Sequence, residues 1–67
     1  MEIPQKLINK WKALRTAGDA VKMAEKVENG YAETFNRAFR IGRCSDDVFK
    51  IMAEFYEEKA NLVKEYL

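Results

Sequence analysis

Residues 31–43 concentrate side chains that can form hydrogen bonds with the flat polar edges of nucleic-acid bases. Asparagine can bind adenine through its amide oxygen and nitrogen together, and arginine can bind guanine through two parallel N–H groups. Glutamate can accept a hydrogen bond from cytosine, and threonine or tyrosine hydroxyls can reach bases or phosphates. This combination predicts base contacts to DNA from Tyr31, Glu33, Thr34, Asn36 and Arg37.

Residues suited to catalysis or metal binding are scarce. There is no histidine, and Cys44 is the single cysteine. A zinc site needs several ligands, and a cysteine nucleophile needs an adjacent base. Asp46 and Asp47 are adjacent, so they point to different positions on a helix and do not form a catalytic pair. We therefore expect a protein that is not an enzyme and uses no cofactor, metal ion or small-molecule substrate.

The elements that must position these side chains are helical. Pro4 suits a first helical turn, and Gly18 and Gly42 permit the left-handed backbone that ends a helix. Asp19 and Ser45 are the expected N-caps of the second and fourth helices. There is no strand alternation, and the pattern predicts a single all-α domain over residues 1–67, with helices at about 4–15, 20–27, 31–40 and 45–67.

The second and third predicted helices are short and are joined by a turn that contains Gly30. Two short helices with a glycine turn between them are the layout of a helix-turn-helix. In this motif the first helix needs a small residue where the second crosses it, and Ala24 occupies that place. Phe35, Ala38 and Phe39 form the inner stripe of the third helix, which leaves its polar residues for the major groove of DNA.

The stretch "DAVKMAEKVENGYAETFNRAFRIGRCS", residues 19–45, resembles the phage-repressor and Cro-like helix-turn-helix family. Within it, "TFNRAF" is similar to the recognition-helix run of that family, although the turn before Tyr31 is one residue longer. The resemblance implies a transcriptional regulator that binds operator DNA, often as a dimer. By position, it implies that Phe35 and Ala38 are buried and that Asn36 and Arg37 face the DNA.

The net charge of +1 is unevenly distributed along the chain. Residues 5–43 carry nine Lys or Arg against four Asp or Glu, whereas residues 44–67 carry three against six. Affinity for DNA comes largely from neutralising phosphates, so the basic part is the expected contact region. The predicted phosphate contacts are Lys10, Lys22, Arg40 and Arg43.

The predicted helix over residues 45–67 has two adjacent apolar stripes, which is more than a helix with one neighbour requires. One contains Val48, Met52, Phe55, Leu62 and Tyr66, and the other contains Phe49, Ala53, Tyr56, Ala60, Val63 and Leu67. One stripe can close the core, and the other predicts a homodimer interface formed by Phe49, Tyr56, Val63 and Leu67. The alternative is that both stripes are used inside one protomer.

Two hypotheses therefore follow from the sequence. The first is a sequence-specific, repressor-like DNA-binding protein of phage or prokaryotic type, acting as a dimer. The second is a small helical protein-interaction module, an adaptor or antitoxin-like inhibitor, that uses the exposed face of the fourth helix. The lone cysteine, the lack of a signal-peptide pattern and the lack of a long apolar run predict a cytoplasmic location without membrane contact.

Overall fold

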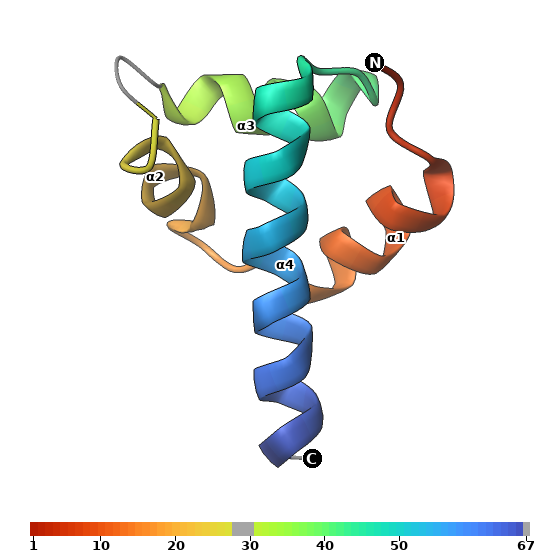
Figure 1. Ribbon diagram of the computed structural model, residues 1–67, viewed down its shortest axis with the longest axis vertical. Coiled ribbons are helices and arrows are strands. Elements are labelled where there is room, and N and C mark those ends of the chain that lie inside the picture. Colours follow the sequence, from red (N-terminus) through yellow and green to blue (C-terminus); the bar gives the residue numbers. More distant parts are fainter. Residues whose placement is uncertain (28–30, 67) are drawn as a thin grey trace.

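The computed structural model describes residues 1–27 and 31–66, the last of these by its backbone alone. Within those ranges the chain forms four helices and no sheet, so the predicted all-α fold is confirmed. In Figure 1, α3 crosses one end of the molecule, and α4 runs down the middle with α1 and α2 on opposite sides of it. The helices are α1 (Gln5–Leu14), α2 (Asp19–Ala24), α3 (Ala32–Ile41) and α4 (Asp46–Tyr66).

Gly42 ends α3 as predicted, but Gly18 does not end α1. That helix ends at Leu14 with Arg15 in extended backbone as its C-cap, and Gly18 is the N-cap of α2. Helix α2 is also shorter than predicted. Gly18 and Gly42 both have positive φ, at 89° and 71°. The chain leaves the α-helical pattern after Ala24, because the N–H groups of Lys26 and Val27 bond to carbonyls only three residues back. The predicted turn at Gly30 lies outside the described residues.

The prediction that Asp19 is the N-cap residue of α2 is wrong. Gly18 is the N-cap residue, and Asp19 is the first residue of the helix itself. Its carboxylate is 2% exposed and receives four hydrogen bonds. The donors are Thr16 N (2.9 Å), Thr16 Oγ1 (2.9 Å), Lys59 Nζ (2.8 Å) and Tyr56 Oη (3.3 Å). We call Asp19 and its three partners, Thr16, Tyr56 and Lys59, the Asp19 cluster, and it joins the α1–α2 turn to α4.

The first residues of the chain are attached to the end of α3. Ile3 N donates to Gly42 O at 2.9 Å, and Cys44 N donates to Met1 O at 3.1 Å, in an isolated antiparallel bridge. Ile3 itself is buried in the core. The sequence pattern did not predict this pairing, because a bridge of this length has no recognisable alternation.

The core is built around aromatic side chains that meet on α4. Trp11 from α1 stacks on Tyr56 with ring centroids 5.8 Å apart, and Phe39 from α3 meets the same tyrosine edge-on at 5.7 Å. Such ring pairs stabilise a fold by about 0.5–1.5 kcal/mol each beyond the area they bury. Met23 from α2 and Phe35 from α3 complete a core to which every helix contributes.

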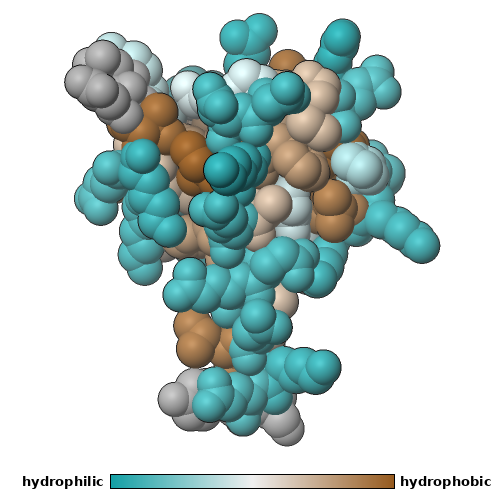
Figure 2. Space-filling model, in the orientation of Figure 1, coloured by the Kyte–Doolittle hydropathy of each residue, from teal (hydrophilic) through white to brown (hydrophobic). Residues whose placement is uncertain are grey.

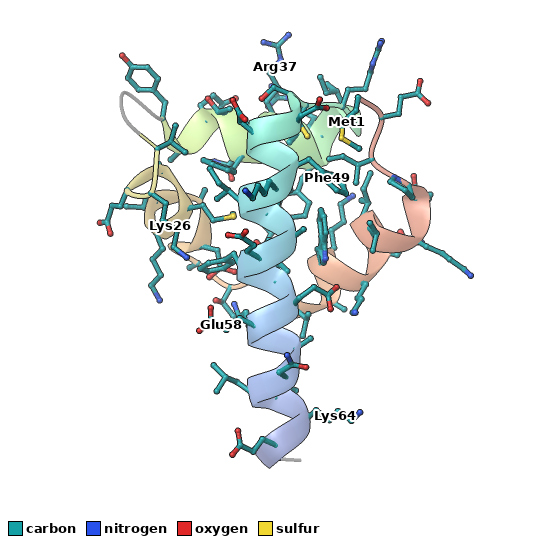
Figure 3. All side chains as sticks on the ribbon, in the orientation of Figure 1. Met1, Lys26, Arg37, Phe49, Glu58 and Lys64 are labelled. Atoms are coloured by element: carbon teal, nitrogen blue, oxygen red, sulfur yellow. The ribbon has the colours of Figure 1, made fainter. Side chains whose placement is uncertain are left out.

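The two apolar stripes of α4 are both used internally over the first half of the helix. Tyr56 is 0% exposed, so its predicted place in a dimer interface is wrong. Phe49 is half-buried and lies 5.7 Å from the Trp11 ring, and Figure 3 shows it pointing from α4 toward α1. It is therefore also chiefly a core residue, and the internal alternative holds for this half of α4.

The second half of α4 extends beyond the body of the protein. Residues 61–65 are all exposed, and Val63 keeps 39% of its surface open to solvent. The other predicted interface residue, Leu67, lies outside the described residues. Of the four predicted interface residues, Val63 is the one that the structure leaves on an exposed surface.

The two positive-φ glycines allow a matched stability test. A Cβ at Gly18 would meet no atom within 4 Å, whereas a Cβ at Gly42 would lie 3.3 Å from Ile8 Cδ1. We expect Gly18→Ala to lower the free energy of unfolding by about 1 kcal/mol, the cost of the left-handed backbone. Gly42→Ala should cost about 2 kcal/mol because the buried Ile8 must also move. Urea unfolding measures both free-energy losses. A loss for Gly18→Ala that equals or exceeds the loss for Gly42→Ala would contradict the close contact between Gly42 and Ile8.

The Asp19 cluster predicts a loss of stability in acid. Burial raises the pKa of Asp19, but the hydrogen bonds from Lys59 and Thr16 outweigh it and leave the pKa below its ordinary value of 3.8. Ionised Asp19 therefore stabilises the fold fully above pH 3.8, and this contribution is lost as the pH falls toward the lower folded pKa.

Asp19→Asn is the variant that tests this coupling. We expect it to lower the free energy of unfolding at neutral pH by about 3 kcal/mol, because Lys59 loses its buried partner. The difference from the natural protein should narrow as the pH falls below 3.8. Urea unfolding followed by Trp11 fluorescence measures this, and a difference that stays constant down to the lowest pH would contradict the coupling.

Candidate nucleic-acid interface

The third helix is held by one face and exposed on the other. Phe35, Ala38 and Phe39 are buried, as the periodicity predicts, and Gly42 ends the helix with its left-handed backbone. Glu33, Arg37 and Arg40 lie at i, i+4 and i+7 on the opposite side, and all three are exposed. In Figure 3, Arg37 points from α3 away from the body of the protein.

A groove of about 680 Å³ runs between α3, the start of α4 and the first residues of the chain. Apolar atoms of Ile41 and Val48 form part of its lining. Its positive charge comes from two arginines and from the amino terminus, which donates to Cys44 O at 2.7 Å. Five of the predicted DNA-contacting residues line this groove, namely Tyr31, Glu33, Thr34, Arg37 and Arg43.

Arg40 lies next to this groove and is paired with Glu33. The Arg40 Nη2 to Glu33 Oε1 distance is 3.3 Å, and both side chains are about two-thirds exposed. Exposed ion pairs of this kind contribute about 0–1 kcal/mol. The pair can therefore open at little cost, and Arg40 can reach an anion beside α3.

Asn36 lies on a different flank of α3 from Thr34. It is half-buried, and its Oδ1 accepts a hydrogen bond of 2.5 Å from Arg15 Nη2. Together with Lys12 these two residues line a second hollow, of about 510 Å³, where the ends of α1, α2 and α3 meet. Of the two residues predicted to project outward together, Arg37 is open to solvent and Asn36 is partly covered.

Arg15 and Lys12 are residues of this surface that the sequence analysis did not identify. A sequence signal was present for Arg15, because it stands four residues after Trp11 in a segment predicted to be helical to residue 15, which places it on the apolar side. In the structure it is the C-cap residue directly after α1. A charged residue at that register must either reach out of the core or find a partner. Its partner in α3 is 21 positions away, which no local pattern predicts.

Lys10 and Lys22 are not brought to the exposed face of α3. Lys10 Nζ lies 3.0 Å from a carboxylate oxygen of Glu57 in α4. Lys22 lines a smaller hollow of about 290 Å³ with Glu58 and Leu62, also from α4. These two predicted phosphate contacts therefore lie beside the central helix, away from the groove that the other predicted contacts line. Local sequence could not show which neighbour each lysine would meet.

The surface offers little other chemistry. Burial raises the pKa of the Cys44 thiol, and the nearby Asp46 adds to this effect, against an opposing influence of the amino terminus. Across residues 1–27 and 31–66, no three His, Cys, Asp or Glu side chains are grouped closely enough to hold a metal ion. None of the helices in this part of the chain combines the length and apolar character needed to cross a bilayer.

Searches against protein-family models, curated proteins and solved structures give no match to this chain.

Proposed function

We propose that this chain is a sequence-specific regulator of transcription that binds double-stranded DNA through a helix-turn-helix, in the manner of phage and prokaryotic repressors. The observation that carries the proposal is Arg37. It is exposed at the centre of the outward face of α3, while Phe35 and Phe39 on the opposite face are buried in the core. A helix anchored by one face, with an arginine on the other, is suited to base recognition in the major groove.

The arrangement of α2 and α3 supports this use of the helix. The two helices pack against each other, and the small residue Ala24 lies against the core at the end of α2. The major groove is about 12 Å wide, and a helix with its side chains is about 10–12 Å across. A helix exposed along one side, as α3 is, has a cross-section that fits this groove.

Different residues would have different tasks in the complex. Arg37 would bind guanine through two N–H groups, and Tyr31 and Thr34, from the same groove, would contact neighbouring bases or phosphates. Arg43 and Arg40 would neutralise phosphates on the DNA backbone. Glu33 would accept a hydrogen bond from cytosine and would repel the acceptor edge of guanine, and thereby reject incorrect sequences.

The proposed dimer would use the projecting end of α4. Leu62 and Val63 are neighbouring apolar residues there, 50% and 39% exposed. Figure 2 shows apolar surface in this view as small separate patches, one of them near the lower end of α4. The same exposed residues are what a partner protein would bind if the chain were instead an adaptor, so the DNA experiment is the one that separates the two functions.

The first test is a fluorescence-anisotropy titration on duplexes selected from a random pool. The regulator should bind its selected duplex with micromolar or tighter affinity at low salt. With two phosphate-neutralising arginines in each protomer, a dimer makes about four such contacts, and affinity should fall about 100-fold between roughly 50 and 200 mM salt. Failure to bind any duplex at low salt would contradict the proposal and favour the adaptor.

The same titration with two variants tests the role of Arg37. Arg37→Met should lose about tenfold or more in affinity for the selected duplex and should discriminate less between sequences. Lys10→Met removes the same charge from a residue paired with Glu57 beside α4, and it should change affinity less than twofold. Equal losses in the two variants would mean that α3 is not the recognition helix.

Sedimentation equilibrium tests the proposed dimer contact. Val63→Glu places a charge on the exposed end of α4, so it should shift a dimer toward the monomer without changing the helical content. Lys64→Glu, one position along on the same exposed turn, is the matched control and should have a smaller effect. A dimer that persists in Val63→Glu would remove this surface from the interface.

A further inference from the structure

The hydrogen bond between Arg15 and Asn36 restricts what Asn36 can do. Arg15 Nη2 lies 2.5 Å from Asn36 Oδ1. A guanidinium group has only N–H donors, so the oxygen of the amide, and not its nitrogen, must face it. The two amide atoms point in different directions from the same carbon. The Asn36 NH2 group is therefore turned away from Arg15.

Arg15 is itself held in place by α3. Its Cζ lies 4.7 Å from the centre of the Phe39 ring, and that ring is buried. An arginine over an aromatic face is held by attraction to the ring. Among the described residues, no carboxylate forms an ion pair with Arg15. Its charge thus remains directed at Asn36 and at the hollow beside it.

The Asn36 NH2 group is open to solvent. It donates a hydrogen bond to none of the described residues, and it is not among their buried polar atoms that have no partner. Asn36 lines the 510 Å³ hollow together with Lys12 and Arg15, so a ligand in that hollow lies beside its amide. A ligand entering that side of α3 meets an amide that offers hydrogen atoms.

We infer that Arg15 is a positioning residue that turns Asn36 into a hydrogen-bond donor and thereby sets the base it prefers. Guanine presents two acceptors, N7 and O6, in the major groove, whereas adenine presents one acceptor and one amino donor. Bidentate pairing with adenine requires the Asn36 oxygen to accept from the adenine amino group. That oxygen already accepts from Arg15, so the amino group would have to approach it next to the N–H groups of the guanidinium. The Arg15–Asn36 pair should therefore select guanine. This inference rests on the proposed binding of DNA.

The experiment compares duplexes that carry guanine or adenine at one position. That position is identified as the one at which Asn36→Ala loses the preference of the natural protein. The natural protein should bind the guanine duplex about tenfold more tightly than the adenine duplex. Replacing that guanine by 2-aminopurine paired with thymine, which keeps the N7 acceptor and lacks O6, should remove most of this preference.

Arg15→Met should reduce the ratio of the two affinities toward one, because the amide can then turn over and accept from adenine. Lys12→Met is the matched control. It removes the same charge from the same hollow without a contact to Asn36, so it should weaken both duplexes by an equal factor. In the Asn36→Ala background, Arg15→Met should not change the ratio any further. Circular dichroism establishes that each variant retains its helices.

The outcomes separate this inference from the proposed function. A ratio that stays unchanged in Arg15→Met, with both affinities reduced alike, would make Arg15 a phosphate contact and would overturn the inference while DNA binding stands. If Arg15→Met loses its helices, Asn36→Ala alone tests the inference. An Asn36→Ala variant that keeps the guanine preference of the natural protein at every position would overturn it. Failure of the natural protein to bind any duplex would overturn both proposals.

Discussion

The buried carboxylate of Asp19 is the interaction on which the arrangement of the helices depends. It accepts hydrogen bonds from the α1–α2 turn on one side and from Tyr56 and Lys59 of α4 on the other. Helix α2 has six residues, which is too short to be stable alone in water. Its position is therefore determined by this cluster and by the burial of Met23, and α3 packs in turn on α2.

Tyr56 links the polar cluster to the aromatic core. Its ring lies against Trp11 and Phe39, while its hydroxyl donates to Asp19. Burial raises the pKa of Tyr56, and the neighbouring Asp19 carboxylate raises it further, so the hydroxyl remains a donor over the whole physiological range. The same side chain thus fixes the distance between α4 and both α1 and α3. The residues on the outward face of α3 are therefore not needed for the packing of the core.

Features that arise from local sequence could be predicted, and features that arise from packing could not. The four helices, the left-handed Gly18 and Gly42 and the buried Phe35 and Phe39 follow from periodicity and turn chemistry alone. The direction of the Asp19 side chain does not, because an aspartate at a helix start can either cap the helix or turn inward. The exposure of Arg37, by contrast, could be predicted, because it follows from the periodicity of α3 alone.

The partners of Lys10, Asn36 and Tyr56 depend on how the helices meet. Lys10 pairs with Glu57, and Asn36 accepts a hydrogen bond from Arg15, at separations of 47 and 21 positions along the chain. The apolar pattern of α4 showed that the helix had more apolar surface than one neighbour needs. It could not show that three helices would surround the first half of α4.

The position of α3 relative to the free end of α4 limits the symmetry of any assembly. The two lie at opposite ends of the long axis of the molecule, which measures 34 Å against 24 and 18 Å for the shorter axes. Two copies joined antiparallel through the ends of α4 would present their α3 helices in opposite directions. A twofold axis that runs along α4 instead turns both α3 surfaces the same way.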